Sequence, residues 1–286
     1  MPALEERFTY HEGRPLRYLT GGSGPPILLC HGFLGSAENF DDWFDALLPR
    51  RTVVAPDLPG FGRSAPLNGA HIATSMARAA LSAADHAGIE DYDVAGLCLG
   101  TPVALAVQRA RPHTVKSMVL HTPLLAPRLV RRRFHFQVGV MLSRSVYPVI
   151  VWCGHQRSIS DLYKRLLIEG SDVDPRAAQA NFDNQMRSNP RAAKEWLLDG
   201  LKRNDLLQLR RGTNRVLILT AAEDRIVDAE RLRTAVGDVD SIDLAVIEQG
   251  GHAWTQAMLR HQRELIAAFL DGRPLPLPQR TVASAA

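Results

Sequence analysis

The pentapeptide Gly-Leu-Cys-Leu-Gly at 96–100 places one thiol, that of Cys98, between two glycines. An apolar run at 92–95 precedes it and is typical of a strand, and a helical pattern opens directly after it at Thr101. In such a strand-to-helix turn the glycines let the backbone bend sharply without a Cβ clash, so the central side chain stands clear of the sheet. The start of the helix also favours a thiolate. The spacing therefore predicts that Cys98 is a nucleophile.

An acid and a histidine each follow a later apolar run of the chain. Asp224 comes after the seventh run, and His252 comes after a pair of glycines behind the eighth. His252 would activate Cys98 and later assist the incoming water or other acceptor. Asp224 would hold the imidazole in one tautomer and stabilise its cation. Glu223 and Asp228 compete with Asp224 for the role of the acid.

Acyl transfer also needs hydrogen-bond donors for the negative charge that develops on the carbonyl oxygen. The segment HGFLG at 31–35 follows the third apolar run, and we expect the backbone amides of Phe33 and Leu99 to bind this oxyanion. Removing one such donor costs about 3–4 kcal/mol in a comparable enzyme. We expect His31 to organise its loop, and Asp57 and Arg63 to fix the loop after the fourth run, rather than to act in catalysis.

Short apolar runs and amphipathic helical patterns alternate along the chain and would position these groups. The third to eighth runs are almost continuously apolar, as in strands that are buried on both faces of a parallel sheet. The first two runs alternate and meet around Gly13, which predicts an antiparallel hairpin. The alternation predicts a doubly wound α/β sheet. The expected strands are 7–11, 16–20, 26–30, 52–55, 92–95, 117–121, 215–220 and 241–247, and the expected helices are 38–48, 74–87, 102–110, 229–236 and 255–270.

The alternation stops between the sixth and seventh strands. About ninety residues there show helical patterns and no good strand pattern, which is too long for a simple connection. Ligands bind at the carboxyl ends of the strands in open α/β sheets, so an insertion at this point would cover the site. We therefore expect a core of 1–123 and 213–272, a helical cap of 124–212, and a disordered tail at 273–286.

These landmarks resemble those of the α/β-hydrolase superfamily, in the same order, over about residues 7–270 apart from the cap. HGFLGS at 31–36 and DLPGFGRS at 57–64 are similar to the corresponding stretches of small capped esterases, thioesterases and related lyases. The resemblance implies an α/β-hydrolase fold with a mostly parallel eight-stranded sheet. The usual spacing of that family, an Asp before a small apolar pair, favours Asp224 as the acid.

Cys98 departs from this resemblance, because most members carry serine at that position. Dienelactone hydrolases and polyhydroxyalkanoate synthases also carry cysteine there. The synthases are similar around 96–101 and at Gly251-His252. They are usually longer and lack a His-Gly loop of this kind, so a hydrolase fits the chain better.

The sequence also suggests residues for a substrate pocket. His121 ends the sixth strand, and the start of the cap is rich in aromatic and apolar residues. These residues could line an acyl pocket, or they could form the core of the cap itself, and His121 could be structural. The candidate pocket residues are His121, Phe134, Phe136, Val138, Met141, Tyr147 and Trp254.

Two cysteines and an arginine cluster have plainer interpretations. Cys30 lies on an apolar strand and Cys153 in the cap, and we expect both to be structural. The cluster Arg128, Arg131, Arg132 and Arg133 is either a solvated helix face or a dock for phosphate, such as the nucleotide of coenzyme A, or for an acidic carrier protein.

The composition excludes several other classes of protein. The chain has 286 residues, 45% of them hydrophobic and 22% charged, which is ordinary for a globular protein. A net charge of +4 is too small to indicate nucleic-acid binding. Three cysteines and no apparent export signal suggest a reducing, cytoplasmic location. We expect no membrane span, and no metal or cofactor, because neither ligand spacing nor a phosphate-binding glycine motif is present.

Together these patterns predict a cysteine-dependent acyl hydrolase that acts on an activated ester, a lactone or a thioester through an acyl-cysteine. One alternative is an acyltransferase that uses the same three residues and passes the acyl group to an amine, an alcohol or a thiol. Another is a non-catalytic receptor or interaction protein on a hydrolase scaffold. The three candidate catalytic residues, all present, argue against the receptor.

Overall fold

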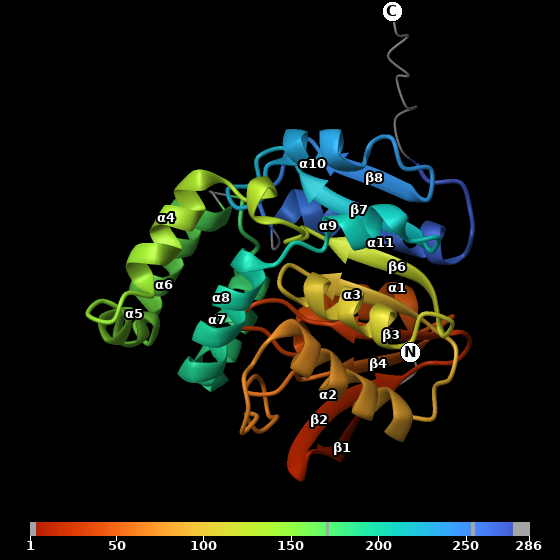
Figure 1. The fold of residues 1–286 in the computed structure, drawn as a ribbon, viewed down its shortest axis with the longest axis horizontal. Coiled ribbons are helices and arrows are strands. Elements are labelled where there is room, and N and C mark those ends of the chain that lie inside the picture. The colour runs from red at the N-terminus through yellow and green to blue at the C-terminus, as the bar shows by residue number, and fades with distance from the viewer. Residues whose placement is uncertain (1–3, 170–171, 253–254, 277–286) are drawn as a thin grey trace, which may run out of the picture.

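A single eight-stranded sheet runs through the molecule (Figure 1). The computed structural model describes residues 4–169, 172–252 and 255–276. The strand order is β1-β2-β4-β3-β5-β6-β7-β8. The strands are β1 (Glu5–His11), β2 (Arg14–Gly21), β3 (Pro26–Cys30), β4 (Thr52–Pro56), β5 (Tyr92–Leu97), β6 (Val115–His121), β7 (Arg215–Ala221) and β8 (Ile242–Ile247).

The direction of the strands confirms the expected α/β-hydrolase fold. Strands β1 and β2 form an antiparallel hairpin, and β2 joins the sheet antiparallel to β4. The strands from β4 to β8 in the order of the sheet are all parallel. The inner strands β3, β5, β6 and β7 are almost wholly buried, whereas the edge strand β8 is half-buried along one side. The continuous apolar runs of the inner strands follow from burial on both faces.

Helices cover both faces of the sheet. On one face α2 (Ala73–His86) and α3 (Gly100–Ala110) pack against each other, and α10 (Ala229–Val236) joins the same apolar cluster. On the other face α1 (Asp41–Leu47), which follows the short helix η1 (Ala37–Phe40), packs against α11 (Gln256–Leu270). These helices fall within a few residues of their expected bounds.

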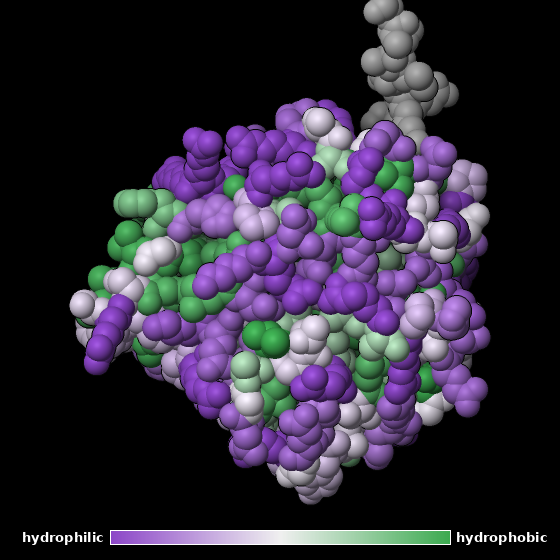
Figure 2. Space-filling model, in the orientation of Figure 1, coloured by the Kyte–Doolittle hydropathy of each residue, from purple (hydrophilic) through white to green (hydrophobic). Residues whose placement is uncertain are grey.

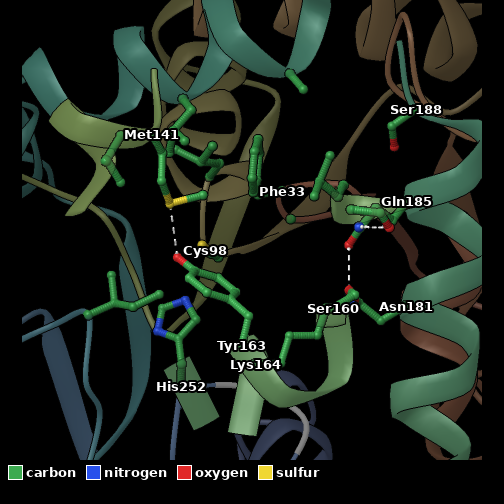
Figure 3. Close-up of a pocket in the computed structure, with 18 of the residues that line it drawn as sticks. Phe33, Cys98, Met141, Ser160, Tyr163, Lys164, Asn181, Gln185, Ser188 and His252 are labelled. Carbon is green, nitrogen blue, oxygen red and sulfur yellow. Dashed lines mark hydrogen bonds between the residues drawn. The ribbon is translucent and has the colours of Figure 1, made fainter. Parts of the chain in front are cut away.

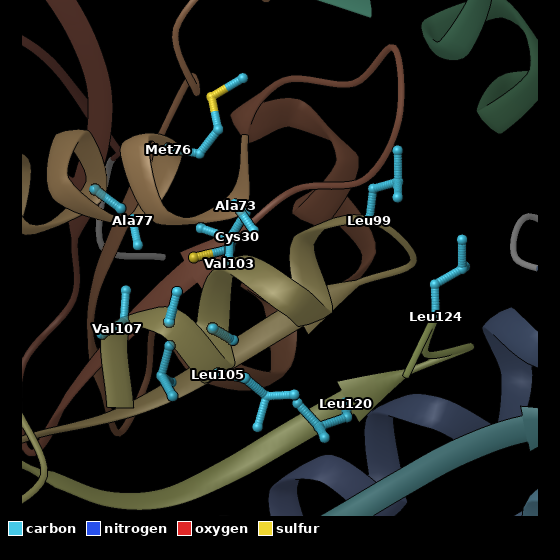
Figure 4. Packing of buried hydrophobic residues seen from close by; sticks show 14 of the residues in the cluster. Cys30, Ala73, Met76, Ala77, Leu99, Val103, Leu105, Val107, Leu120 and Leu124 are labelled. Carbon is cyan, nitrogen blue, oxygen red and sulfur yellow. The ribbon is translucent and has the colours of Figure 1, made fainter. Parts of the chain in front are cut away.

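Cys30 lies inside the first of these clusters, among side chains of α2 and α3 (Figure 4). Burial raises the pKa of its thiol to about 12. A thiol with this pKa stays protonated, so Cys30 behaves as a small apolar core residue.

The expected helical cap follows β6. It comprises η2 (Pro127–Leu129), α4 (Arg132–Met141), α5 (Tyr147–Gly154), α6 (Arg157–Tyr163), a π-helical turn η3 (Lys164–Glu169), α7 (Pro175–Arg187), α8 (Pro190–Lys202) and α9 (Leu206–Arg211). Helices α4 to α8 project beyond one end of the sheet (Figure 1). Asp174 and Asn189 start α7 and α8 by accepting hydrogen bonds from first-turn amides, and a proline follows each cap residue.

Helix α8 is the part of the cap that is anchored most firmly on the core. The buried ring of Trp196 packs edge-on against His31 and lies 5.0 Å, centroid to centroid, from Phe61. Gly200 on the same helix lies against the side chain of Leu99, where a Cβ would clash. These contacts fix α8 directly above the turn that carries Cys98.

The end of the chain departs in part from expectation. We expected 273–286 to be a disordered tail, but Leu275 packs against the apolar cluster under α1 and α11. Residues 277–286 lie outside the described part of the chain.

Candidate active site

Cys98 sits at the expected sharp turn between β5 and α3. Its φ is +51°, in the left-handed region that residues other than glycine seldom adopt. Its backbone N–H donates to the carbonyl oxygen of His121 on the neighbouring strand, 2.9 Å away. A Cβ on Gly96 would lie 2.6 Å from the carbonyl oxygen of Gly100, and one on Gly100 would run into the end of β3. Both glycines are therefore required by close backbone packing, which supports the strained conformation of Cys98.

Asp224 and His252 meet at the carboxyl ends of β7 and β8. Nδ1–H of His252 donates to Oδ2 of Asp224 over 2.9 Å, and both side chains are buried. The other carboxylate oxygen of Asp224 accepts from the backbone amides of Ile226 and Val227, at 2.7 and 2.9 Å. The carboxylate is thus held by three donors. Neither Glu223 nor Asp228 makes this contact in the described part of the chain; Asp228 instead starts α10.

The second nitrogen of His252 faces the thiol side of the site. Burial lowers the pKa of His252, but the charges of Asp224 and Cys98 raise it, and the net result lies well above the ordinary value. Nε2 of His252 has no hydrogen-bond partner within the described residues. Figure 3 shows its ring and the sulfur of Cys98 at the same end of a cavity. The site therefore places beside the thiol an imidazole that Asp224 orients and whose protonated form it stabilises.

The two expected oxyanion donors flank Cys98. Leu99 is the N-cap residue of α3, and Phe33 lies in the loop after β3. A Cβ on Gly32 would lie 3.3 Å from that of Cys98, so this loop runs directly alongside the thiol. Neither amide donates to an acceptor elsewhere in the described chain. Both are free to bind a ligand oxygen.

His31 holds this loop from below, as expected. Nε2 of His31 accepts from the amide of Leu58 over 2.9 Å, so the proton lies on Nδ1, which donates to the carbonyl of Gly32 over 2.8 Å. Burial lowers the pKa of His31 to about 4, which keeps the ring neutral and suited to both bonds.

Asp57 ties the loop after β4 to the same region. Its buried carboxylate accepts from the amides of Ala37 and Arg63, each at 2.8 Å, and forms an ion pair with Arg17 at 3.1 Å. Arg17 also binds Glu38, in the short helix η1 after the Phe33 loop. Asp57 and the Arg63 amide therefore have the organising role that their positions suggested.

A cavity of about 390 Å³ extends from Cys98 and His252 into the cap. Of the candidate pocket residues, the structure brings five together along its wall: His121, Phe134, Val138, Met141 and Tyr147. Cys153, which we expected to be structural, lines it too. Phe136 does not, because it points outward from α4 and is 74% exposed. Trp254 lies outside the described residues.

The far wall of the cavity is polar, which the sequence analysis missed. Ser160, Asn181 and Gln185 line it from α6 and α7, opposite Cys98 (Figure 3). Gln185 is bound to the carbonyl of Gly154 at 2.7 Å, and Asn181, which is 3% exposed, lines the same wall. Polar residues four apart on one helix, as at 181 and 185, lie on the same side of that helix, and this spacing could have predicted the polar wall from the sequence.

His121 is both buried and part of the pocket wall, beside the ring of Trp43. Burial, together with the neighbouring charge of His252, lowers its pKa to about 3. His121 is therefore neutral, which leaves His252 as the histidine beside the thiol that can hold the positive charge.

The arginine cluster separates into two parts. Nε–H of Arg131 donates to the backbone carbonyl of Asp224 over 2.7 Å, and its guanidinium also lies 3.8 Å from the carboxylate of Asp228, so this residue is tied to the core. Its backbone amide also donates to the carbonyl of Ile226, at 2.8 Å. By contrast Arg128, Arg132 and Arg133 are exposed.

Comparison with known proteins agrees with the fold. A family model described as the alpha/beta hydrolase fold matches residues 25–254, most of the chain. The chain belongs to the α/β-hydrolase family. A pyrrolizixenacetamide deacetylase from Xenorhabdus hominickii is 31% identical to this α/β-hydrolase over 129 residues, 45% of the chain and 48% of that protein. The chain thus spans about half the length of the first curated relatives that it matches.

Two further similarities of this α/β-hydrolase extend over more of the chain. A 2-hydroxymuconate semialdehyde hydrolase from Pseudomonas putida is 26% identical over 243 residues, 82% of this chain and 83% of that protein. An esterase structure from Exiguobacterium antarcticum superposes with a TM-score of 0.75 at 16% identity, covering 95% of this chain and 98% of the other. At this identity the structural similarity supports the fold alone.

Among the described residues no helix has both the length and the apolar character needed to cross a bilayer. In the same part of the chain no three His, Cys, Asp or Glu side chains are grouped as metal ligands.

Proposed function

We propose that the protein hydrolyses an activated acyl compound, such as a thioester, an aryl ester or a lactone, with Cys98 as nucleophile, His252 as base and Asp224 as the acid that orients it. The observation that carries this proposal is the hydrogen bond of 2.9 Å between His252 and a fully held Asp224, at the cavity that also contains Cys98. The chemistry matches that of other paired thiol and imidazole nucleophiles.

In the acylation step the sulfur of Cys98 attacks the carbonyl carbon, and the thiol proton passes to Nε2 of His252. The carbonyl oxygen becomes an anion, which accepts hydrogen bonds from the amides of Phe33 and Leu99. When the carbonyl re-forms, the bond to the leaving group breaks, and His252 returns its proton to that group. Asp224 stabilises the imidazolium throughout, and the product is an acyl-cysteine.

In the second step His252 takes a proton from water, whose oxygen attacks the thioester carbonyl. When that carbonyl re-forms, the bond to sulfur breaks, and His252 returns the proton to Cys98. Sulfur makes the first step selective, because a thiolate leaves more readily than an alkoxide. An adduct from an alkyl ester would expel Cys98 and return to substrate, whereas an adduct from a thioester, an aryl ester or an enol lactone would lose its own leaving group. We therefore propose activated donors as the substrate class.

The walls of the cavity indicate the shape of the acyl group. Phe134, Val138 and Met141 line it with apolar side chains, and the amide of Asn181 lies on the opposite wall. We propose a substrate whose apolar part fills the cap side of the cavity and whose polar group accepts or donates a hydrogen bond at Asn181.

Mass spectrometry of the intact protein after mixing with an activated ester tests the proposal. We expect the mass of one acyl group on the wild type and none on Cys98→Ala. An adduct on both, or turnover unchanged by the substitution, would show that Cys98 is not the nucleophile. No adduct and no turnover with any donor would instead support a binding protein on this scaffold.

Product analysis then separates hydrolysis from acyl transfer. The donor panel includes thioesters of coenzyme A and of a carrier protein, each with and without an amine, an alcohol or a thiol as acceptor. Free acid in every mixture would support the hydrolase. Acylated acceptor as the main product would support the alternative, an acyltransferase with the same three residues.

A further inference from the structure

Three consecutive helices of the cap turn large apolar side chains toward solvent. Each helix carries them three or four residues apart, so they form a stripe along one side of that helix. Phe136 and Trp152 are 74% and 61% exposed. The apolar face consists of Phe136 and Val140 on α4, Val149 and Trp152 on α5, Ile159 and Leu162 on α6, and Leu166 on the adjoining turn η3. Figure 2 shows apolar side chains gathered over α4–α6, and a continuous patch of this kind marks an interaction surface.

The same helices are strongly basic. Between residues 132 and 166 the sequence has six Lys and Arg against a single acidic residue, Asp161, which pairs with Arg157. Four of the six are exposed arginines that form no ion pair with any residue in the described part of the chain: Arg132, Arg133, Arg144 and Arg165. The apolar face is therefore accompanied by positive charge that the protein does not neutralise.

We infer that this face docks on an anionic phospholipid bilayer, with α4, α5 and α6 lying in the interface. Apolar side chains that include tryptophan and phenylalanine, combined with arginine, are what such a surface binds: the rings enter the headgroup layer and the arginines pair with lipid phosphates. A second copy of this chain fits the face poorly, because a symmetric contact would bring the same unpaired arginines together.

The apolar face and the cavity meet at one residue. Ile159 is 41% exposed on α6 and also lines the cavity that holds Cys98. Val151 and Tyr163, on α5 and α6, line the cavity as well. Docking through this face would therefore bring the cavity to the bilayer, from which an acyl chain could enter. Lipid binding itself does not depend on the chemistry proposed for Cys98.

Flotation with vesicles tests the inference on the full chain carrying Cys98→Ala, so that a failure of the proposed reaction cannot affect the result. We expect the protein to float with vesicles of phosphatidylcholine and phosphatidylglycerol in equal parts, and to remain behind with phosphatidylcholine alone. Raised salt should release it, because screening weakens the pairing of arginine with phosphate.

Two pairs of substitutions examine the two components of the face separately. Phe136→Glu with Trp152→Glu removes apolar contact, and Arg132→Glu with Arg133→Glu reverses charge; each pair should weaken vesicle binding at least about 25-fold. None of the four residues lines the cavity. The matched controls are Leu207→Glu and Arg260→Glu, at exposed positions on α9 and α11, and they should bind as the parent does.

Three results would overturn the inference. The first is equal binding to neutral and anionic vesicles. The second is a dimer at micromolar concentration that Phe136→Glu with Trp152→Glu converts to a monomer, since this would assign the face to a second copy. The third is a pair of results for Arg132→Glu with Arg133→Glu: unchanged vesicle binding, and a raised KM for a coenzyme A thioester when Cys98 is intact. This pair would indicate that the two arginines bind the nucleotide of coenzyme A.

Discussion

Nε of Arg131 lies 2.7 Å from the backbone carbonyl oxygen of Asp224, to which it donates a hydrogen bond. Arg131 directly precedes the first long helix of the cap, and Asp224 holds the imidazole of His252. Val130, the residue before Arg131, forms an isolated antiparallel β-bridge with Val227, in the loop that carries Asp224. The entrance of the cap is thus attached to the loop that carries the acid, which links the two parts of the molecule at the proposed catalytic site.

Arg131→Gln should lower kcat/KM about tenfold, equivalent to about 1.4 kcal/mol of transition-state stabilisation. The shorter side chain loses its bond to the Asp224 carbonyl, so the carboxylate is held less firmly against His252. Steady-state kinetics with a thioester measures the change. Arg133→Gln, an exposed neighbour without an ion pair in the described chain, should retain the parent activity. Equal losses in both variants would show that general charge matters and the bond to Asp224 does not.

Cys98→Ser should lose at least about a hundredfold in kcat/KM on a thioester. The ratio between the rates on the thioester and on an alkyl ester of the same acid should also shrink, because a serine alkoxide, unlike the Cys98 thiolate, does not leave more readily than the alkoxide of the ester. Rates on the matched pair of esters measure both effects. Cys153→Ser, which changes the other thiol of the cavity wall, is the control and should keep the parent ratio. A wild-type enzyme that turns over the alkyl ester faster would contradict the argument from sulfur.

The protein should lose stability as the pH falls from about 6.5 towards 3, in part through His121. Burial lowers the pKa of folded His121 to about 3, whereas the unfolded chain takes up a proton near 6.5. The stability that the neutral ring provides is therefore present above pH 6.5 and is lost as the pH falls. Between pH 7.5 and pH 4.5 the free energy of unfolding of His121→Gln should therefore fall by about 2 kcal/mol less than that of the parent. Urea unfolding at pH 7.5 and pH 4.5 measures the difference.

His113→Gln serves as the control for this measurement, because His113 is exposed. It should follow the same pH dependence as the parent. If His121→Gln also follows the parent at both pH values, then folded His121 titrates normally and its neutral state does not contribute.

Gly100→Ala should destabilise the protein by roughly 3 kcal/mol or more, because its new methyl group would meet the backbone carbonyls of Cys30 and His31. Gly139→Ala is the contrasting change. Nothing lies within 4 Å of a Cβ at that position in α4, so alanine should stabilise by about 0.5–1 kcal/mol through helix propensity. Thermal unfolding of the two variants measures the expected loss of stability in the first and the expected gain in the second. A stable Gly100→Ala protein would mean that the turn at Cys98 tolerates displacement.

Asn181→Leu tests the polar wall of the cavity. If the buried amide binds a polar group of the substrate, its loss should raise KM about tenfold for a donor with such a group. A purely alkyl donor should be affected much less. Comparison of KM for the two donors, with the exposed Asn68→Leu as control, separates recognition from a general change in the cap. Equal changes for both donors would show that Asn181 supports only the structure.

Local patterns in the sequence predict the sheet, most helices and the turn at Cys98. Continuous apolar runs in 26–30, 92–95 and 215–220 can only be strands buried on both faces, and glycines on either side of Cys98 require a close backbone turn. These signals are local: periodicity and the absence of a side chain act within a few residues. The order of Cys98, Asp224 and His252 along the chain could be read for the same reason.

Tertiary structure alone decided the cavity wall and the surface of the cap. Phe134 and Phe136 are two residues apart and chemically identical, yet one lines the cavity and the other faces solvent. Which side of α4 faces inward depends on how the helix docks, since an apolar stripe on both sides leaves the periodicity ambiguous. The attachment of Arg131 to Asp224 likewise joins segments more than ninety positions apart. No local pattern encodes such a contact, because it exists only after the cap has folded onto the sheet.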